Sequence, residues 1–385
     1  MRSTTLLAYL LLRGASAHRR GALRAAAREQ TAAYLAQRRD ASAPPCPCAD
    51  ASLCAPIGGA PAAEREFYGF GGDGFESFDW EYVTTVAWGA SDNLTCAAHA
   101  AGARVVMAAP ETLLTPNASA REAWARAALA DVTDGLYDGI VFDYEDPLPA
   151  RGEQAAWYAQ LINATKLVFA AANPSLQVSA CVAWSPDDID GRGYEVETMC
   201  AAADLCYVMD YDTRSQVTTQ CIASANAPLA GAQLGIGRYL DLGVAPEKLV
   251  LGVPWYGYRY ECLPGTPRDA TFCPIPLVPF RGVNCSDAAG GEVPYASIMR
   301  VADLPDARVT ARGWDANMAA PWMNVVEANA TVQYWWDDPD SLALKYAFAK
   351  RAGLRGVGPF TWSDLDPENA PEETAAMWAA FGDFL

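Results

Sequence analysis

The 385-residue sequence has few histidines, fewer basic than acidic side chains, and no long apolar segment. Its two histidines, His18 and His99, cannot build a multi-histidine metal site, and a Ser–His–Asp triad would have to use one of them. The 28 Lys and Arg against 46 Asp and Glu give a formal net charge of −18, which disfavours nucleic acid as a partner. We therefore expect carboxylates and aromatic side chains to do any chemistry, with no metal and no cofactor.

The N-terminal segment differs in charge from the rest of the chain. Residues 1–42 contain eight Arg and two acids, a surplus of +6, so the remainder carries −18 − 6 = −24. The apolar run from Leu6 to Leu12, followed by the small residues Ala15 to Ala17, predicts a signal peptide over 1–17. That run is too short to span a membrane, and no later one is long enough. The Arg- and Ala-rich stretch 18–44 is interpreted as a basic pro-segment or tail.

Cysteines and glycosylation sequons also indicate the secretory route. Eleven cysteines predict a disulfide framework with at least one free thiol, although the spacing leaves the pairing open. Cys181 lies in an apolar, strand-like run and is expected to be a buried thiol. The alternative for Cys46, Cys48 and Cys54 is a zinc site. Five Asn-X-Ser/Thr sequons predict a glycoprotein: Asn93, Asn117, Asn163, Asn284 and Asn329.

Short β-rich runs alternate with amphipathic stretches along residues 45–385. The runs are 66–72, 83–89, 103–109, 139–145, 176–184, 205–212, 248–256 and 354–360. Strands that alternate with helices imply a parallel sheet. Eight such units favour an α/β fold of the closed (β/α)₈ TIM-barrel type, and no GxGxxG turn follows the first strand to suggest a dinucleotide fold.

One interval is too long for an ordinary loop and helix. The segment at about 259–333 contains three cysteines, eight prolines and no long periodic helix. We interpret it as a disulfide-pinned insertion after the seventh barrel strand, at the end of the barrel where active sites form. Such an insertion either walls a binding cleft or is an inert elaboration.

The fourth predicted strand carries two carboxylates. It reads Asp-Gly-Ile-Val-Phe-Asp-Tyr-Glu over 138–145. Because side chains alternate along a strand, Val141, Asp143 and Glu145 share one face, while the apolar residues between them suit the helix-facing side. The two acids therefore point into the barrel near its rim. Neighbouring carboxylates push each other's pKa values apart, which is one way to keep a general acid protonated. A solvated strand end is the alternative.

This segment resembles the DGxxxDxE core of the family 18 glycoside hydrolases, the chitinase-type (β/α)₈ barrels. The resemblance covers most of residues 45–385. It includes 182–186, 209–212, 252–258 and 337–342, and, as in the chitobiase-like members, 46–48, 280–282 and 285–290.

The resemblance implies a retaining, substrate-assisted mechanism, in which the substrate's own 2-acetamido oxygen attacks C1. It implies that Glu145 acts as acid and then base, and that Asp143 orients and stabilises the acetamido group. Tyr211, with Met209 on the same strand face, would hydrogen-bond the acetamido carbonyl. Asp212 would hold the sugar or the acetamido group beside it.

The sequence departs from the family pattern at Val141, where the family usually has Asp or Asn. Valine takes no proton and makes no hydrogen bond, so we expect a shifted pH profile and a slower rate, with activity retained. A lectin derived from the same barrel remains an alternative, although such proteins more often lose the acid that Glu145 supplies.

Aromatic residues at predicted strand ends are candidates for the floor of a sugar cleft, because sugar rings stack on aromatic faces. They are Trp88, Trp184, Trp255, Tyr256 and Tyr258, each with core packing as the alternative. At the eighth strand the family places a Trp under the reacting sugar. Phe360 and Trp362 both fit that position, and we favour Trp362. His99 is expected to be a packing or surface residue.

The sequence therefore predicts a secreted or lysosomal glycosidase that hydrolyses β-1,4 bonds between N-acetylglucosamine units. The expected substrates are the chitobiose core of Asn-linked glycans and chito-oligosaccharides, and the expected state is a monomer. The alternatives are a chitinase that acts on polymer and a chitin-oligosaccharide lectin.

Overall fold

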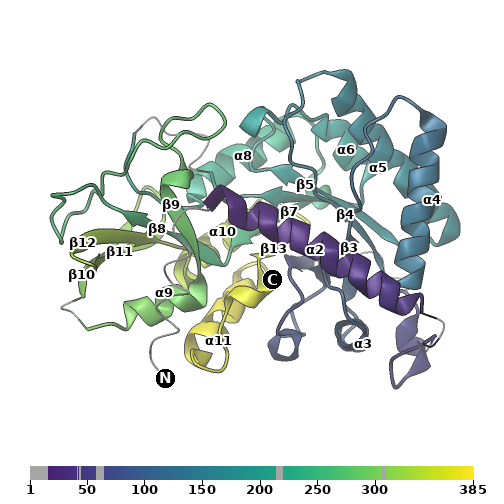
Figure 1. Cartoon of the computed structure of the whole chain (residues 1–385), viewed down its shortest axis with the longest axis horizontal. Coiled ribbons are helices and arrows are strands. Elements are labelled where there is room, and N and C mark those ends of the chain that lie inside the picture. The colour runs from purple at the N-terminus through teal and green to yellow at the C-terminus, as the bar shows by residue number, and fades with distance from the viewer. Residues whose placement is uncertain (1–15, 41, 43–44, 58–64, 214–219, 306–307) are drawn as a thin grey trace.

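Eight parallel strands close into a barrel in the computed structural model (Figure 1), which describes residues 16–385 except 41, 43–44, 58–64, 214–219 and 306–307. The strands are β1 (Glu66–Phe70), β2 (Thr85–Ala87), β3 (Arg104–Ala108), β4 (Gly139–Phe142), β5 (Gln177–Ala183), β6 (Leu205–Met209), β7 (Leu249–Pro254) and β13 (Gly356–Phe360). Closure comes from the pairing of β1 with β13, which sets Glu66 beside Gly356. Each strand falls within one of the eight predicted runs, so the TIM-barrel prediction is confirmed.

Helices cover the outside of the barrel. They are α3 (Asp92–Ala100), α4 (Ala118–Asp134), α5 (Glu153–Ala172), α6 (Val196–Ala202), α8 (Leu229–Asp241), α10 (Pro339–Arg351) and α11 (Pro371–Ala379). Local sequence sets several of their starts. Ser91 caps α3 by accepting from the backbone N–H of Leu94, and Asp338 with Ser341 forms a capping box before α10.

Alternation along the strands separates two apolar cores. On β1, Phe67 packs outward against the helices, whereas Tyr68 and Phe70 fill the barrel interior. The inner core also receives Tyr207 of β6, whose hydroxyl donates to the carbonyl of Gly358 at 3.0 Å. Both faces of every barrel strand are buried, which explains why the strands are almost continuously apolar in sequence.

Between β7 and α10 the chain builds a second, antiparallel sheet. Its strands are β8 (Tyr256–Glu261), β9 (Gly290–Pro294), β10 (Val309–Asp315), β11 (Ala320–Glu327) and β12 (Ala330–Trp335), in the order β10-β11-β12-β8-β9, with α9 (Tyr295–Ala302) after β9. Figure 1 shows this sheet beside the barrel. The insertion therefore has secondary structure of its own, which the scarcity of helical periodicity concealed.

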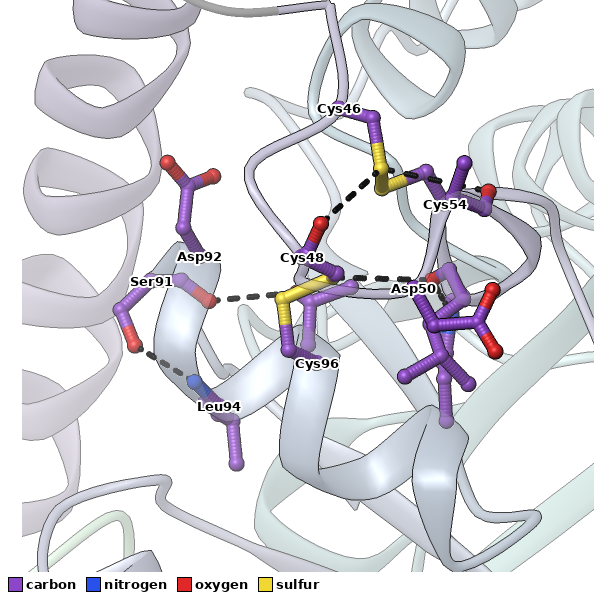
Figure 2. Close-up of a disulfide and its surroundings, with 12 residues drawn as sticks. Cys46, Cys48, Asp50, Cys54, Ser91, Asp92, Leu94 and Cys96 are labelled. Carbon is purple, nitrogen blue, oxygen red and sulfur yellow. Dashed lines mark hydrogen bonds between the residues drawn. A yellow bond between two sulfur atoms is a disulfide. The ribbon is translucent and has the colours of Figure 1, made fainter.

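Five disulfides staple the described part of the chain. Cys46–Cys54 closes a loop within the segment before the barrel, and Cys48–Cys96 ties that segment to α3 (Figure 2). The other pairs are Cys200–Cys206, Cys221–Cys285 and Cys262–Cys273. Cys181 is a buried free thiol, as predicted. The zinc alternative for the first three cysteines is wrong, because all three sulfurs are in disulfides.

The first acid of the 138–145 motif has a structural place, at the N-terminal end of β4. Asp138 accepts from the backbone N–H groups of Ile57 and Val105, and its Oδ2 lies 2.9 Å from Nε2 of His99. Burial lowers the pKa of His99, but the hydrogen bond to Asp138, the charge of Asp138 and the bond to the Leu53 carbonyl together outweigh it, so the net pKa is raised. The network joins the disulfide-rich segment to the barrel.

The predicted pro-segment forms a long helix, α2 (Ser16–Arg38), which runs across the barrel in Figure 1. It contacts β9 of the insertion, β3 of the barrel and α4. The apolar run 6–12 of the predicted signal peptide lies outside the described residues. None of the described helices is both long and apolar enough to cross a membrane.

Asp210, directly after β6, is fully buried near Lys345 of α10. Neither of its carboxyl oxygens has a hydrogen-bond partner among the described residues. The pKa of Asp210 is raised to about 7, mainly by burial; the charge of Lys345 lowers it and that of Asp337 adds to the rise. The unfolded chain loses this proton near its ordinary pKa, so unfolding releases a proton between about pH 4 and pH 7. The stability of the fold should therefore fall as the pH rises through that range.

We expect Asp210→Asn to remove this pH dependence, because the amide stays neutral at every pH. The pKa difference corresponds to roughly 4 kcal/mol at pH 7, so the variant should gain up to that much in free energy of unfolding there and little at pH 4. Urea unfolding at pH 4 and pH 7 measures this change in the free energy of unfolding. Asp241→Asn, which alters an exposed carboxylate, is the control. If the free energy of unfolding depended on pH equally in the wild type and in Asp210→Asn, Asp210 would not be the group responsible.

Candidate active site

The C-terminal end of β4 carries the two acids that the sequence singled out. Val141 faces the inner core, and the chain then places Asp143 and Glu145 at the barrel mouth, where they are 5% and 7% exposed. Ile140 and Phe142 face the outer core between strands and helices. The alternation inferred from the sequence thus brings both carboxylates to the end of the barrel where TIM-barrel enzymes have their active sites.

Guanidinium groups from three other parts of the chain surround Glu145. Nη1 of Arg192 lies 3.1 Å from Oε2 of Glu145, and Nη1 of Arg24 lies 3.2 Å from Oε1. Nη1 of Arg281, in the insertion, donates to the backbone carbonyl of Glu145 at 3.1 Å. Isolated burial of a carboxylate is costly, and these positive charges offset that cost. Both side-chain oxygens of Glu145 are therefore in contact with guanidinium groups.

Arg192 is itself held in place by a second acid. Its Nη2 lies 3.2 Å from Oδ2 of Asp190, and the side chains of both residues are 5% exposed. Both lie in or just after the short 3₁₀ turn Ile189–Gly191, which follows β5, and Arg281 reaches the same Asp190 oxygen at 3.9 Å. Sequence reasoning missed this network. Its signal was the charged run Asp188-Ile189-Asp190-Gly191-Arg192 just beyond a buried strand end.

Asp212 lies at the end of β6 and receives two tyrosine hydroxyls. Tyr256 and Tyr258 donate to its Oδ1 at 2.6 and 2.9 Å, and its own backbone N–H donates to Oδ1 of Asn226. Burial, together with the charges of Asp212 and Asp287, raises the pKa of Tyr258, so its hydroxyl remains a neutral donor. Tyr256, expected from the sequence as a sugar-binding ring, thus also positions Asp212.

Met209 and Tyr211 belong to the inner core at the barrel mouth. The ring of Tyr211 lies 5.4 Å from that of Phe360 and 6.1 Å from that of Tyr256. Trp88, which follows β2, packs edge-on against Phe360 at 5.8 Å. These rings line the mouth between the carboxylates of β4 and the Asp212 side.

The preference for Trp362 as the ring in the barrel mouth is wrong. Phe360 ends β13 with its ring in the inner core, whereas Trp362 has entered a 3₁₀ turn and faces outward. There it stacks on Trp378 of α11 at 5.2 Å with an interplanar angle of 7°. Trp255 lies in the same outer aromatic group, 5.4 Å from Trp362. Phe360 occupies the mouth and Trp362 does not because β13 ends at Phe360.

Trp184 also lies elsewhere than expected. It follows β5 in the outward register and is buried with Ala183 and Ile189. A side chain added at Gly235 of α8 would collide with the backbone of Trp184, so the helix packs closely on it. Alternation along β5 places Cys181 inside the barrel and Trp184 outside, which removes Trp184 from the mouth.

Comparisons with known proteins agree with this geometry. Residues 111–364 match the model of the glycosyl hydrolases family 18. The chain is 39% identical to the di-N-acetylchitobiase of Rattus norvegicus, over 88% of this chain and 93% of that protein. It is 36% identical to the Homo sapiens di-N-acetylchitobiase, over 86% and 87%. The chain therefore belongs to glycosyl hydrolase family 18, and the resemblance inferred from its motifs is confirmed.

Solved structures confirm the fold. A class V chitinase mutant from Cycas revoluta in complex with (GlcNAc)3 superposes with a TM-score of 0.65 at 17% identity, covering 83% of this chain and all of that one. The chitinase-like agglutinin from Robinia pseudoacacia superposes with a TM-score of 0.63 at 19% identity, covering 83% and 99%. An enzyme and an agglutinin share this fold, so the fold does not by itself distinguish catalysis from binding.

The outward packing of Trp362 predicts a stability effect. Trp362→Ala should lower the free energy of unfolding by about 3–5 kcal/mol, because it empties the stack with Trp378 and Trp255. Trp314→Ala is the control, since that side chain is 43% exposed, and should cost less than about 1 kcal/mol. Denaturant unfolding measures both. Equal stability of the two variants would show that Trp362 is not a core residue.

Proposed function

We propose that this chain is a retaining glycosidase that hydrolyses the β-1,4 bond between N-acetylglucosamine units, in the chitobiose core of Asn-linked glycans and in chito-oligosaccharides. The observation that carries the proposal is the placement of Glu145 and Asp143 at the barrel mouth, with Tyr211 and Asp212 following β6, the next strand but one. Family membership and the names of the curated relatives support the same substrate class.

In the first step Glu145 donates its proton to the glycosidic oxygen as the bond from that oxygen to C1 breaks. The substrate's 2-acetamido oxygen attacks C1 and forms an oxazolinium ion. The Asp143 carboxylate, beside the acetamido group, stabilises the positive charge that develops there. Tyr211 hydrogen-bonds the acetamido oxygen, and Asp212 holds the sugar. No metal or cofactor takes part in this scheme.

In the second step Glu145 removes a proton from water, which attacks C1 and reopens the oxazolinium ring. Two displacements at C1 retain the anomeric configuration. Val141, below Asp143 on the same inner face, offers neither a proton nor a hydrogen bond. For that reason we propose that the pH profile of this chain differs from those of members with Asp at that position.

Arg192 is assigned as a positioning residue for Glu145. Its 3.1 Å contact holds one carboxyl oxygen, and Asp190 prevents the guanidinium from turning away. Glu145 is therefore oriented by a group that does not touch the reacting bond. A positioning role of this kind should appear in the rate and in the pH profile more than in substrate affinity.

Exposure of the sequons supports a secretory location. All five asparagines are exposed: Asn93, Asn117, Asn163, Asn284 and Asn329. Five disulfides also suit an oxidising compartment. We propose a glycosylated, monomeric, lysosomal or secreted enzyme, whose predicted signal peptide is 1–17.

Product analysis tests the proposed activity. We expect the wild type to cleave chitotriose between pH 4 and pH 7 with retention of configuration, and Glu145→Gln to lower kcat by about 10²–10⁴-fold, because the proton donor is lost. Asp143→Asn should lose most turnover while still binding substrate. Glu122→Gln, which alters an exposed carboxylate on α4, is the control. Binding of chitotriose by a wild type that never cleaves it would identify a lectin.

Substitutions of Arg192 test its positioning role. Arg192→Met should lower kcat roughly 10- to 100-fold with little change in KM. It should also move the basic limb of the pH profile to higher pH, because a proton donor that loses a neighbouring positive charge stays protonated to higher pH. Arg192→Lys should recover part of the rate. Thermal unfolding of each variant separates this effect from loss of fold. A lower rate with an unchanged pH profile and no recovery by Lys would leave Arg192 a structural residue only.

A further inference from the structure

Helix α2 occupies the mouth of the barrel in which the proposed reaction takes place. Its N-terminal part contacts the insertion at β9 and at the 3₁₀ turn Asp287–Ala289, and farther along it contacts β3. Twenty-three residues of α-helix span roughly 34 Å, enough to cross the end of a barrel. Figure 1 shows α2 as one continuous helix across the molecule.

Two arginines on one face of α2 reach the ends of neighbouring strands. Arg24 contacts Oε1 of Glu145 at 3.2 Å and donates to the backbone carbonyl of Asp143 at 3.3 Å. Arg28, one turn later, donates to the carbonyl of Ala109 after β3 at 3.1 Å. The oxygen that Arg24 contacts belongs to the proposed proton donor. While that contact lasts, the oxygen is directed at a guanidinium and is not available to a glycosidic oxygen.

The helix also divides the space that a substrate would fill. On one side lies a cavity of about 460 Å³, lined by Arg24, Arg28, Asp143 and Glu145 among others. On the other side lies a cavity of about 800 Å³, lined by α2 residues such as Ala27 and by residues such as Trp88. Between them Ala27 is 4% exposed within the inner aromatic core. One oligosaccharide cannot contact both Glu145 and Trp88 while α2 remains there.

The contacts of α2 suit an attachment that can be released. In the part of α2 that carries Arg24 and Arg28 the buried side chain is the small Ala27, which buries little apolar area, whereas the larger Tyr34 and Leu35 are buried farther along the helix. Away from Glu145, Tyr34 donates to Oδ1 of Asp92 at 2.8 Å at the edge of the larger cavity, and Arg39, just after the helix, pairs with Asp131 and Asp134. The helix contains no cysteine, and the first cysteine of the chain is Cys46. A single cut between Arg39 and Cys46 therefore detaches it from the disulfide framework.

We propose that α2 is an inhibitory pro-segment that blocks substrate and holds Glu145 through Arg24 until it is displaced or removed. The proposal rests on the proposed function, since it assigns Glu145 as the proton donor. It gives the basic charge of 18–44 a specific role, because Arg24 and Arg28 face a mouth that contains Asp143, Glu145 and their acidic neighbours. The alternative is that α2 stays in place and forms a permanent wall of the substrate-binding cleft.

Activity of the full-length chain tests inhibition. If the closed form is favoured about tenfold, Arg24→Ala should raise kcat/KM for chitotriose by about tenfold. Tyr34→Ala should raise it as well, because it loosens the helix at a site that touches neither Glu145 nor Asp143. Arg126→Ala, on the exposed face of α4, is the matched control. An active wild type whose kcat/KM is unchanged in both α2 variants overturns the inhibition and leaves the proposed function standing. Inactivity of all these chains overturns the proposed function itself.

Hydrogen exchange then distinguishes a lid from a wall. In the Asp143→Asn chain, where the Arg24–Glu145 contact remains and turnover is low, we expect chitotriose to decrease the protection of the α2 amides from Leu23 to Tyr34. Protection of β4 and β6 amides should be unchanged or higher. Unchanged or increased protection of α2 with sugar bound would show that the helix forms part of the binding cleft, and the proposal would fall.

Discussion

The arrangement at the barrel mouth depends on the need to compensate buried carboxylates with fixed positive charge. Glu145 is 7% exposed, so in this low-dielectric position its charged form requires partners. Arg192 supplies one from the loop after β5, and Asp190 in turn holds that guanidinium. Arg281 reaches the same cluster from the second sheet. A single ionic cluster thus joins β4, the β5 loop and the insertion, and determines how they meet.

The same requirement explains why α2 lies where it does. The mouth offers Glu145 an additional contact, and Arg24 supplies it from a basic segment of the same chain. Apolar burial holds the helix near its C-terminal end, where Tyr34 and Leu35 enter the outer core, whereas charge complementarity between Arg24 and Glu145 contributes at the mouth. The proposed general acid and its proposed inhibitor thus depend on the same ion pair.

Outside the mouth, two buried features respond to pH in the same direction. Burial lowers the pKa of His99, but the interactions with Asp138 and the Leu53 carbonyl together raise it. The raised pKa favours the folded state while the histidine is protonated, and this contribution is lost as the pH rises through the raised pKa. The raised pKa of Asp210, due mainly to burial, also favours the fold at lower pH. Neither group touches the proposed reacting atoms, so acid stability is built into the scaffold. This agrees with an enzyme proposed to work in an acidic compartment.

The eight barrel strands, the family and the inward placement of Asp143 and Glu145 were predictable, because alternation with period two and short buried runs are local properties of sequence. Cys181 was predictable for the same reason. Trp362 was misplaced because its side chain follows the last residue of β13, turns with the loop and stacks on α11. Trp184 was misplaced because it keeps the outward register of β5 and packs against α8. Arg192, Asp190 and Arg24 were not recognised as neighbours of Glu145, because ion pairs between residues far apart in the sequence leave no periodic pattern in it. The sequence by itself determined a carboxylate-based barrel with a basic N-terminal segment. Only the tertiary structure decided which arginines meet Glu145, because burial in three dimensions selects the partner of a charge.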